Sequence, residues 1–313
     1  MVAKSDLVAA IGIGSNSVRL LIVGRSEHGE HAQAMERLEQ VTRLAGYSMA
    51  GYERLLEAKS MEETLRAALG FARHARERSA NLVGVIATEA VRASSNRDEL
   101  TSRLEEELGL PVTIISGEEE ARLGWLAVAA SEDNPDNGST LGVIDIGGGS
   151  TDLSVGYAGA EVPESVVSIQ VGSRTAMRRF DLHRAVEISK LWGILNSVAI
   201  ETSAQASSVK PEPESAVVIG GTAEVLAGVY NAQEGTDPAE KVLIERDWMA
   251  RWLSRMALVG QEGRITQGVP ADRADVIVAG GVILLSLLEM WGLQQFSVSK
   301  RNILDGFIRQ QGR

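Results

Sequence analysis

The chain of 313 residues contains no cysteine. Disulfide bonds, zinc–thiolate centres and a cysteine nucleophile are therefore excluded. Histidine is also scarce, and no two of the four histidines have the spacing of zinc ligands. They are His28, His31, His74 and His183.

Long apolar segments are missing as well. The N-terminal stretch MVAKSDLVAAIG is too short and too polar for a secretory signal. The most apolar run, VIVAGGVILLSLLEMW, lies between Asp275 and Gly292. It falls short of the roughly 20 residues that a membrane helix needs, and it contains Glu289. We therefore expect a soluble, cytoplasmic protein with no membrane partner.

An excess of positive charge is lacking too, because the formal net charge is −11. This balance disfavours nucleic acids and membrane surfaces as partners, since long-range repulsion slows the encounter with polyanions. A phosphate-bearing ligand would need metal ions and local arginines to overcome the overall field. A hydrophobic content of 44% supports a sizeable core, and the length allows two domains.

The same local pattern opens both halves of the chain. In each half, a glycine-containing turn joins two apolar strands, which predicts a hairpin. The predicted strand pairs are 8–13 with 17–23 and 141–146 with 151–157. Helices and strands alternate after each pair, so the sequence predicts an α/β fold with mixed sheets, built twice.

The remaining predicted elements follow from periodicity and from glycine and proline positions. Helices are expected at 53–79, 98–108, 118–130, 173–205 and 303–310, and strands at 82–87, 112–115 and 166–171. Strand–glycine–helix units are expected at 216–230 and 275–290, and loops at 131–139 and 210–215.

The two glycine-rich turns, Gly14-Ser15-Asn16 and Gly147-Gly148-Gly149-Ser150, have two interpretations. Glycine permits tight turns, and it also lets backbone N–H groups approach phosphate oxygens. Neither turn is a Walker A loop or a dinucleotide fingerprint, because a strand follows each. Asp145 directly precedes the second turn, where a carboxylate could hold Mg²⁺ beside a phosphate or simply hydrogen-bond the turn.

Three acidic residues, Glu118, Glu119 and Glu120, follow the strand VTIIS and Gly117. Acids in the first turn of a helix are stabilised by the helix dipole, which is a purely structural interpretation. The functional alternative is a general base that takes a proton from water attacking a phosphate, with Arg92 and Arg122 neutralising substrate oxygens. Spacing alone leaves both open.

Six stretches together give the chain a family resemblance. They are IGSNSVRLLIV near the start, ATEAVRASSN at 87–96, ISGEEEARLGWLAV at 115–128, VIDIGGGSTDLSVG at 143–156, VVIGGTAEVLAG at 217–228 and GVPADRADVIVAGGVILL at 268–285. In order and spacing, the chain resembles the exopolyphosphatase / guanosine pentaphosphate phosphohydrolase family in its short, two-domain form. The resemblance covers nearly the whole chain.

The resemblance implies two ribonuclease-H-like domains of the actin-like ATPase superfamily facing a central cleft. The domains would span 1–128 and 129–299, with a final helix at about 300–313 packing back on the first. It further implies removal of the terminal phosphate from inorganic polyphosphate with Mg²⁺ or another divalent cation as cofactor. Guanosine pentaphosphate or tetraphosphate and a second copy of the chain are further implied partners.

The resemblance also assigns roles to individual residues. Glu120 stands at the position of the catalytic glutamate, and Asp145 at that of a metal-binding aspartate. Glu119 and Asp152 are further candidate metal ligands. The implied phosphate-binding residues are Gly14, Ser15, Asn16, Arg92, Gly147, Gly148, Gly149 and Ser150.

Two positions depart from the family pattern. Gly12 stands where the first loop normally has aspartate, and Leu304 stands where the C-terminal motif normally has arginine. Loss of the first carboxylate is expected to weaken Mg²⁺ binding or to misplace its waters. We therefore hold two hypotheses, a working exopolyphosphatase and a polyphosphate- or alarmone-binding regulatory protein; an actin-like ATPase or kinase is a weaker third.

Overall fold

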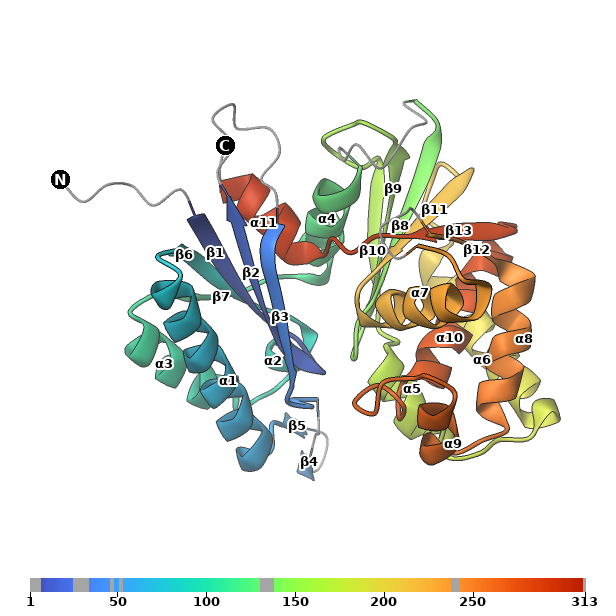
Figure 1. Cartoon of the computed structure of the whole chain (residues 1–313), viewed down its shortest axis with the longest axis horizontal. Helices are drawn as coiled ribbons and strands as arrows, with labels where there is room; N and C mark the ends of the chain where they lie inside the picture. The colour runs from blue at the N-terminus through green and yellow to red at the C-terminus, as the bar shows by residue number, and fades with distance from the viewer. Residues whose placement is uncertain are drawn as a thin grey trace. The chain divides into compact units, whose positions relative to one another are not determined.

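The computed structural model describes residues 7–24, 34–45, 48–50, 53–129, 138–237 and 242–311. These residues form two compact units (Figure 1). The first contains the described residues up to Leu123 together with those from Ile303 onward, and the second runs from Gly124 to Asn302. The division falls inside helix α4 (Gly117–Val128).

The first unit is built on a five-stranded mixed sheet with the order β3-β2-β1-β6-β7. Strands β1, β2 and β3 are antiparallel neighbours, whereas β6 and β7 run parallel to β1. The strands are β1 (Leu7–Ile13), β2 (Ser17–Gly24), β3 (Ala34–Val41), β6 (Asn81–Ala87) and β7 (Val112–Ile114). A short separate hairpin pairs β4 (Ser48–Ala50) with β5 (Glu53–Leu55).

Side chains of β1 alternate between two cores, as the pleat of a strand requires. Ile11 and Ile13 are buried with residues of α1 (Ala58–Glu77) and α3 (Arg97–Leu108) on one face of the sheet. Val8 and Ala10 face the opposite core, which contains residues of α11 (Ile303–Gln311). The final helix therefore packs on the first sheet, far in sequence from the strands it covers (Figure 1).

The second unit has a six-stranded sheet with the order β10-β9-β8-β11-β13-β12. Its strands are β8 (Thr140–Ile146), β9 (Thr151–Tyr157), β10 (Ser165–Ile169), β11 (Ser215–Ile219), β12 (Val242–Glu245) and β13 (Gln295–Val298). One face carries the large core shared with α5 (Ser173–Phe180), α6 (Ile188–Ala206), α7 (Gly221–Glu234), α8 (Arg246–Ala257) and α10 (Ile277–Met290). On the other face, Trp125 of α4 packs with Leu141 and Val143 of β8.

The same strand arrangement occurs in both units. Counted in chain order within each sheet, the first unit has its third, second, first, fourth and fifth strands side by side, and the second unit has its third, second, first, fourth and sixth. The fifth strand of the second unit, β12, is an additional edge strand antiparallel to β13. In both units the first three strands are antiparallel neighbours and the other two of these five run parallel to the first. This is the ribonuclease-H-like arrangement, so the predicted α/β fold with two such domains is confirmed. Both predicted hairpins are present, at β1–β2 and at β8–β9.

Three predicted elements were wrong in part. Residues 275–290 do not contain a strand, because Ile277–Met290 is one helix, α10. Its apolar residues are buried on all sides in the second core, and such a run does not distinguish a buried helix from a buried strand by periodicity. The helix predicted at 53–79 begins only at Ala58, after β5. The helix predicted at 173–205 is two helices, interrupted at Asp181 by a left-handed residue.

The remaining differences are omissions. Strands β3, β12 and β13 and helix α8 were not predicted, and neither was the short helix α9 (Gln261–Thr266). Most of the loop predicted at 131–139 lies outside the described residues. Across the part of the chain that the structure describes, no helix is both long and apolar enough to cross a membrane.

Candidate active site

The first glycine-rich loop, Gly14 to Asn16, is a tight connection between β1 and β2. Its backbone is closed by the N–H of Gly14 donating to the carbonyl of Ser17 at 2.9 Å. The carbonyls of Ser15 and Asn16 accept bonds from the N–H groups of Ala45 and Thr42, at 2.8 and 3.0 Å. The loop's carbonyl oxygens are thus held by the protein, as a loop that presents N–H groups to an anion requires.

A buried carboxylate lies next to this loop. The hydroxyl of Ser15 is 3.3 Å from Oε2 of Glu89, and Nη1 of Arg54 donates to Oε1 of Glu89 at 2.7 Å. Glu89 is 2% exposed and begins the one-turn helix α2 (Glu89–Arg92). The sequence analysis gave Glu89 no role, although it lies within the stretch ATEAVRASSN. Arg54 carried no sequence signal.

The structure brings Glu120 and Arg92 together. Glu120 lies in the first turn of α4 with 6% of its surface exposed, and its Oε2 is 3.7 Å from Nη1 of Arg92. The same nitrogen donates to the carbonyl of Ile115 at 2.6 Å, which fixes the guanidinium beside the carboxylate. Glu118 differs, because it is largely exposed and its nearest cation is Arg122 at 3.9 Å. The dipole-only interpretation therefore suits Glu118 better than the buried Glu120.

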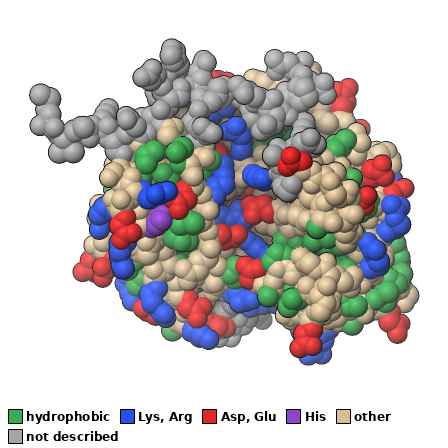
Figure 2. Space-filling view, viewed as in Figure 1, with side chains coloured by type: hydrophobic (Ala, Val, Ile, Leu, Met, Phe, Trp, Pro, Cys, Tyr) green, Lys and Arg blue, Asp and Glu red, His purple; other side chains and the backbone are tan. Residues whose placement is uncertain are grey.

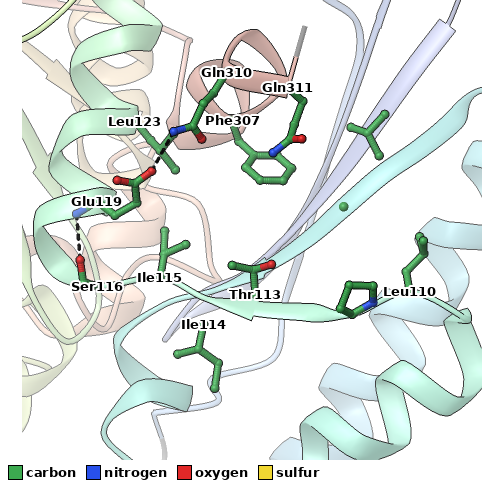
Figure 3. A pocket seen from close by; sticks show the side chains of 13 residues that line it. Leu110, Thr113, Ile114, Ile115, Ser116, Glu119, Leu123, Phe307, Gln310 and Gln311 are labelled. Atoms are coloured by element: carbon green, nitrogen blue, oxygen red, sulfur yellow. Dashed lines mark hydrogen bonds between the residues drawn. The ribbon is translucent and has the colours of Figure 1, made fainter. Parts of the chain in front are cut away.

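Glu119 points into a different environment. Its carboxylate accepts a bond from Nε2 of Gln310 in α11 at 3.1 Å, and it lines a pocket of about 520 Å³ (Figure 3). Leu123 and Phe307 line the same pocket. The structure thus gives Glu119 a partner in α11, and its role as a metal ligand stays a prediction.

The second glycine-rich loop, residues 147–149, packs directly against the first turn of α5. The N–H groups of Ser173 and Arg174 donate to the carbonyls of Gly147 and Gly148, both at 2.9 Å. A Cβ on Gly172 would lie 2.5 Å from the carbonyl oxygen of Gly148, so only glycine allows this approach. As in the first loop, the carbonyl oxygens bond to the protein.

Two carboxylates lie side by side at the end of β8. Asp145 and Asp152 are direct partners in the antiparallel register of β8 and β9, so their side chains share one face of the sheet. Asp152 is 2% exposed and lies 3.3 Å from the Ser150 hydroxyl. A Cβ on Gly220, at the end of β11, would lie 2.6 Å from Oδ1 of Asp145, so bare backbone borders this carboxylate.

This donor set fits a magnesium ion. Mg²⁺ usually takes one or two protein carboxylates and completes its shell with water and phosphate oxygens. Among the described residues, no group of three or more His, Asp and Glu side chains is placed to hold a metal ion. Asp145 and Asp152 give this unit a pair of carboxylates of the number that Mg²⁺ usually takes, and their role as metal ligands stays a prediction.

In the first unit, the positions equivalent to Asp145 and Asp152 are Gly12 and Arg19, so neither has a carboxylate. Gly12 pairs with Arg19 across β1 and β2, and Arg19 in turn pairs with Glu39, with Nε 3.1 Å from Oε1. Position 12 faces α11, where a Cβ would lie 3.1 Å from Cδ2 of Leu304. The two departures from the family pattern, Gly12 and Leu304, are thus in contact. Two uncharged residues, Gly12 and Leu304, thus stand where the family pattern has an aspartate and an arginine.

Two arginines in the second unit were missed by the sequence analysis. Arg174 lies in the first turn of α5 beside the second loop, is 3% exposed, and pairs with Asp275 at 3.4 Å. The guanidinium carbon of Arg273 is 2.7 Å from where a Cβ of Gly221 would lie, at the start of α7. Lys and Arg side chains lie among acidic ones over the face shown in Figure 2, so local positive charge is available despite the net charge of −11.

The chain belongs to the class of proteins built from two ribonuclease-H-like units, and each unit here has a glycine-rich hairpin loop. A family model refines this assignment, since residues 22–311 match the Ppx/GppA phosphatase family. The chain therefore belongs to the Ppx/GppA phosphatase family. The match begins at residue 22, so it includes neither the first loop nor Gly12, where the chain departs from the family pattern.

Solved structures of related proteins agree with this assignment. Two structures of the Aquifex aeolicus family member, one of them a type II variant, share 26% identity with this chain. The type II variant aligns over 98% of this chain and 99% of the other with a TM-score of 0.74, and the second over 97% of both with 0.77. An exopolyphosphatase from Cytophaga hutchinsonii ATCC 33406 has the same fold, with 19% identity, coverage of 98% and 97%, and a TM-score of 0.86.

Proposed function

We propose that this protein is an exopolyphosphatase that hydrolyses the terminal phosphoanhydride bond of inorganic polyphosphate. The observation that carries the proposal is the pair formed by buried Glu120 and partly exposed Arg92 in the same unit as the first glycine-rich loop. The short helix α2 links the two, because Glu89 at its start contacts Ser15 of the loop and Arg92 at its end contacts Glu120.

The reaction needs an aligned water and neutralisation of phosphate charge. Glu120 takes the proton of a water whose oxygen forms a bond to the terminal phosphorus. The bond from that phosphorus to the bridging oxygen breaks, and the shortened chain keeps the bridging oxygen and its electron pair. Arg92 bears a permanent positive charge and neutralises an oxygen of the transferred phosphate.

The second unit offers an acidic pair suited to phosphate chemistry. Asp145 and Asp152 would hold a divalent cation such as Mg²⁺, and Ser150 positions Asp152 through its hydroxyl. When bound, the cation supplies further neutralisation of phosphate oxygens. The N–H groups of residues 147–149 and of Ser15 and Asn16 are the proposed backbone donors to phosphate in their respective units, whereas the N–H of Gly14 is used within its own loop. Guanosine pentaphosphate is a second proposed substrate, because its 5′ γ-phosphate is also held by a terminal phosphoanhydride bond.

A regulatory binding protein is the alternative function. It is favoured by Gly12, since a first loop without a carboxylate at this position can still bind a phosphate chain without supporting turnover. The retained Glu120–Arg92 pair favours the enzyme.

The deciding experiment is phosphate release from long-chain polyphosphate, measured with Mg²⁺ and with a chelator. We expect metal-dependent release, and a loss of roughly 10²–10⁴-fold in kcat for Glu120→Gln, the range typical of a general base. Glu118→Gln is the matched control, because Glu118 is an exposed neighbour in the same helical turn.

Two results would count against this proposal. Equal activity of Glu120→Gln and Glu118→Gln would remove Glu120 from the mechanism. No release by the wild-type chain, with polyphosphate still bound in a direct binding assay, would favour the regulatory alternative.

A further inference from the structure

A second basic feature lies on the first unit. It is a pocket of about 490 Å³ lined by three arginines, Arg54, Arg92 and Arg97, together with residues 93–95 and Asp98. Arg54 and Arg97 expose 42% and 45% of their side chains, and Arg92 exposes 25%. We call this feature the arginine pocket. The sequence analysis assigned no role to Arg54 or Arg97.

Neighbouring groups hold the three guanidinium groups in place. Nη1 of Arg54 bonds to buried Glu89, Nη1 of Arg92 bonds to the Ile115 carbonyl, and Nη1 of Arg97 donates to the carbonyl of Arg92 at 3.2 Å. Arg97 also lies 3.7 Å from the exposed carboxylate of Asp98. A guanidinium has five N–H donors in one plane and binds a phosphate edge through two of them. Three arginines fixed around one pocket are suited to a polyanion.

Helix α3, beside the pocket, also favours an anion there. Asn96 is the N-terminal capping residue of α3, but its side chain bonds to the backbone of Leu56 on both sides of its amide, at 2.9 and 3.1 Å. It therefore does not cap α3, whose first-turn residues Arg97 and Asp98 line the pocket. The positive end of the helix dipole then favours an anion at this place.

The arginine pocket also adjoins the proposed catalytic groups. Arg92 lines the pocket and contacts Glu120, while Arg54 lines it and contacts Glu89, which accepts from Ser15 of the first loop. We infer that the pocket binds the phosphates of the polyphosphate chain that follow the terminal one. This inference rests on the proposed function, and it makes Arg54 and Arg97 determinants of preference for long chains.

The test uses Arg97→Gln, because Arg97 is half exposed and its replacement leaves no buried carboxylate without its ion-pair partner. The matched control is Arg103→Gln, a similarly exposed arginine of the same helix that pairs with Glu62. KM and kcat are measured for tripolyphosphate and for long-chain polyphosphate. Binding of both is measured separately in the Glu120→Gln background. Arg54→Gln, checked for folding by circular dichroism, provides a second variant.

We expect Arg97→Gln to raise the KM for long-chain polyphosphate about tenfold, the usual effect of losing one charge-assisted bond, with a smaller change for tripolyphosphate. The dissociation constant for the long chain should rise in parallel. Arg103→Gln should match the wild type.

The outcomes separate this inference from the proposed function. If the wild type is active and Arg97→Gln behaves like Arg103→Gln at both chain lengths, the subsite is refuted while the enzyme assignment stands. If the wild type shows no turnover but Arg97→Gln weakens long-chain binding, the pocket is supported and the enzyme assignment fails. Equal weakening for both chain lengths would show a general charge effect and would also refute the subsite.

Discussion

At the scale of single residues, the contact between Gly12 and Leu304 changes what replacement of the missing aspartate should do. A carboxylate at position 12 would be directed at the Leu304 side chain, in a core that also contains Ala10 and Phe307. Gly12→Asp is therefore expected to lower the free energy of unfolding by roughly 2–4 kcal/mol, because the ionised group loses water against Leu304 and its cross-strand neighbour Arg19 already pairs with Glu39. It should not raise phosphate release.

Two companion variants identify the cause. Gly12→Ala adds a Cβ 3.1 Å from the flexible end of Leu304 and no charge, so it should stay within about 1 kcal/mol of the wild type. Gly12→Asp combined with Leu304→Arg should recover stability, since the new carboxylate gains a cation. Chemical denaturation of the four proteins checks this. If Gly12→Asp alone is as stable as the wild type and more active, the contact with Leu304 does not determine the effect of a carboxylate at position 12.

At the scale of secondary-structure elements, the docking of α11 depends on one close backbone approach. A Cβ on Gly306 would lie 2.0 Å from the carbonyl oxygen of Leu123 in α4, so an alanine there requires the helix to move. Gly306→Ala is expected to destabilise the first unit by about 3 kcal/mol or more, and to increase hydrogen exchange in α11. Gly70→Ala in α1, where a Cβ would have no atom within 4 Å, should instead stabilise by about 0.5–1 kcal/mol. Normal protection of α11 in Gly306→Ala would contradict the packing.

The link between β3 and α1 predicts a pH dependence. Burial acts to raise the pKa of Glu36, but hydrogen bonds from His74 and Arg78, at 2.9 and 3.0 Å, outweigh it and hold the pKa below its usual value. A carboxyl with a lowered folded-state pKa contributes stability above its unfolded pKa, and this is lost as pH falls through the folded value. The difference in unfolding free energy between wild type and Glu36→Gln should therefore be present at neutral pH and vanish in acid. Glu106→Gln, at an exposed position of α3, is the control; a difference independent of pH would exclude this ion pair as the cause.

The sequence predicted some elements better than others for identifiable reasons. The hairpins at β1–β2 and β8–β9 were predictable because alternating apolar residues flank short turns that contain glycine. Helix α10 was not, since burial on all sides removes the periodicity that distinguishes a helix from a strand. Strand β3 was missed because it is a sheet edge with four of its eight residues charged or polar, leaving little apolar alternation.

In the candidate site too, some residues could be found from the sequence and others could not. Glu120 and Arg92 were found through family motifs, and the structure places them together. Arg54 and Arg97 were not found, because surface arginines gain meaning only when folding gathers them around one pocket. The contact of Gly12 with Leu304 joins positions at opposite ends of the chain, which spacing in one sequence does not reveal.

At the scale of the whole molecule, each unit has its own hydrophobic cores, so each can lose stability without the other. The second unit relies on a fully buried arginine, Arg264, which is 0% exposed. It donates to the carbonyls of Met256, Ala274 and Arg184, each at 2.9 Å, and so joins helix α8 to two segments outside the helices and strands. Burial lowers the pKa of Arg264 to about 10, with Asp275 opposing the shift, so the group remains charged at neutral pH.

Arg264→Met should therefore destabilise the second unit selectively. Its removal leaves three buried carbonyl groups without their donor, which is expected to lower the free energy of unfolding by about 3 kcal/mol or more. Hydrogen exchange followed by mass spectrometry should show faster exchange in α8 and α10, with α1 and β1 unchanged. Arg255→Met, at an exposed position of α8, is the control for loss of charge alone. Equal acceleration in both units would mean that they unfold as one cooperative body, and the separate cores would then not act as separate folding units.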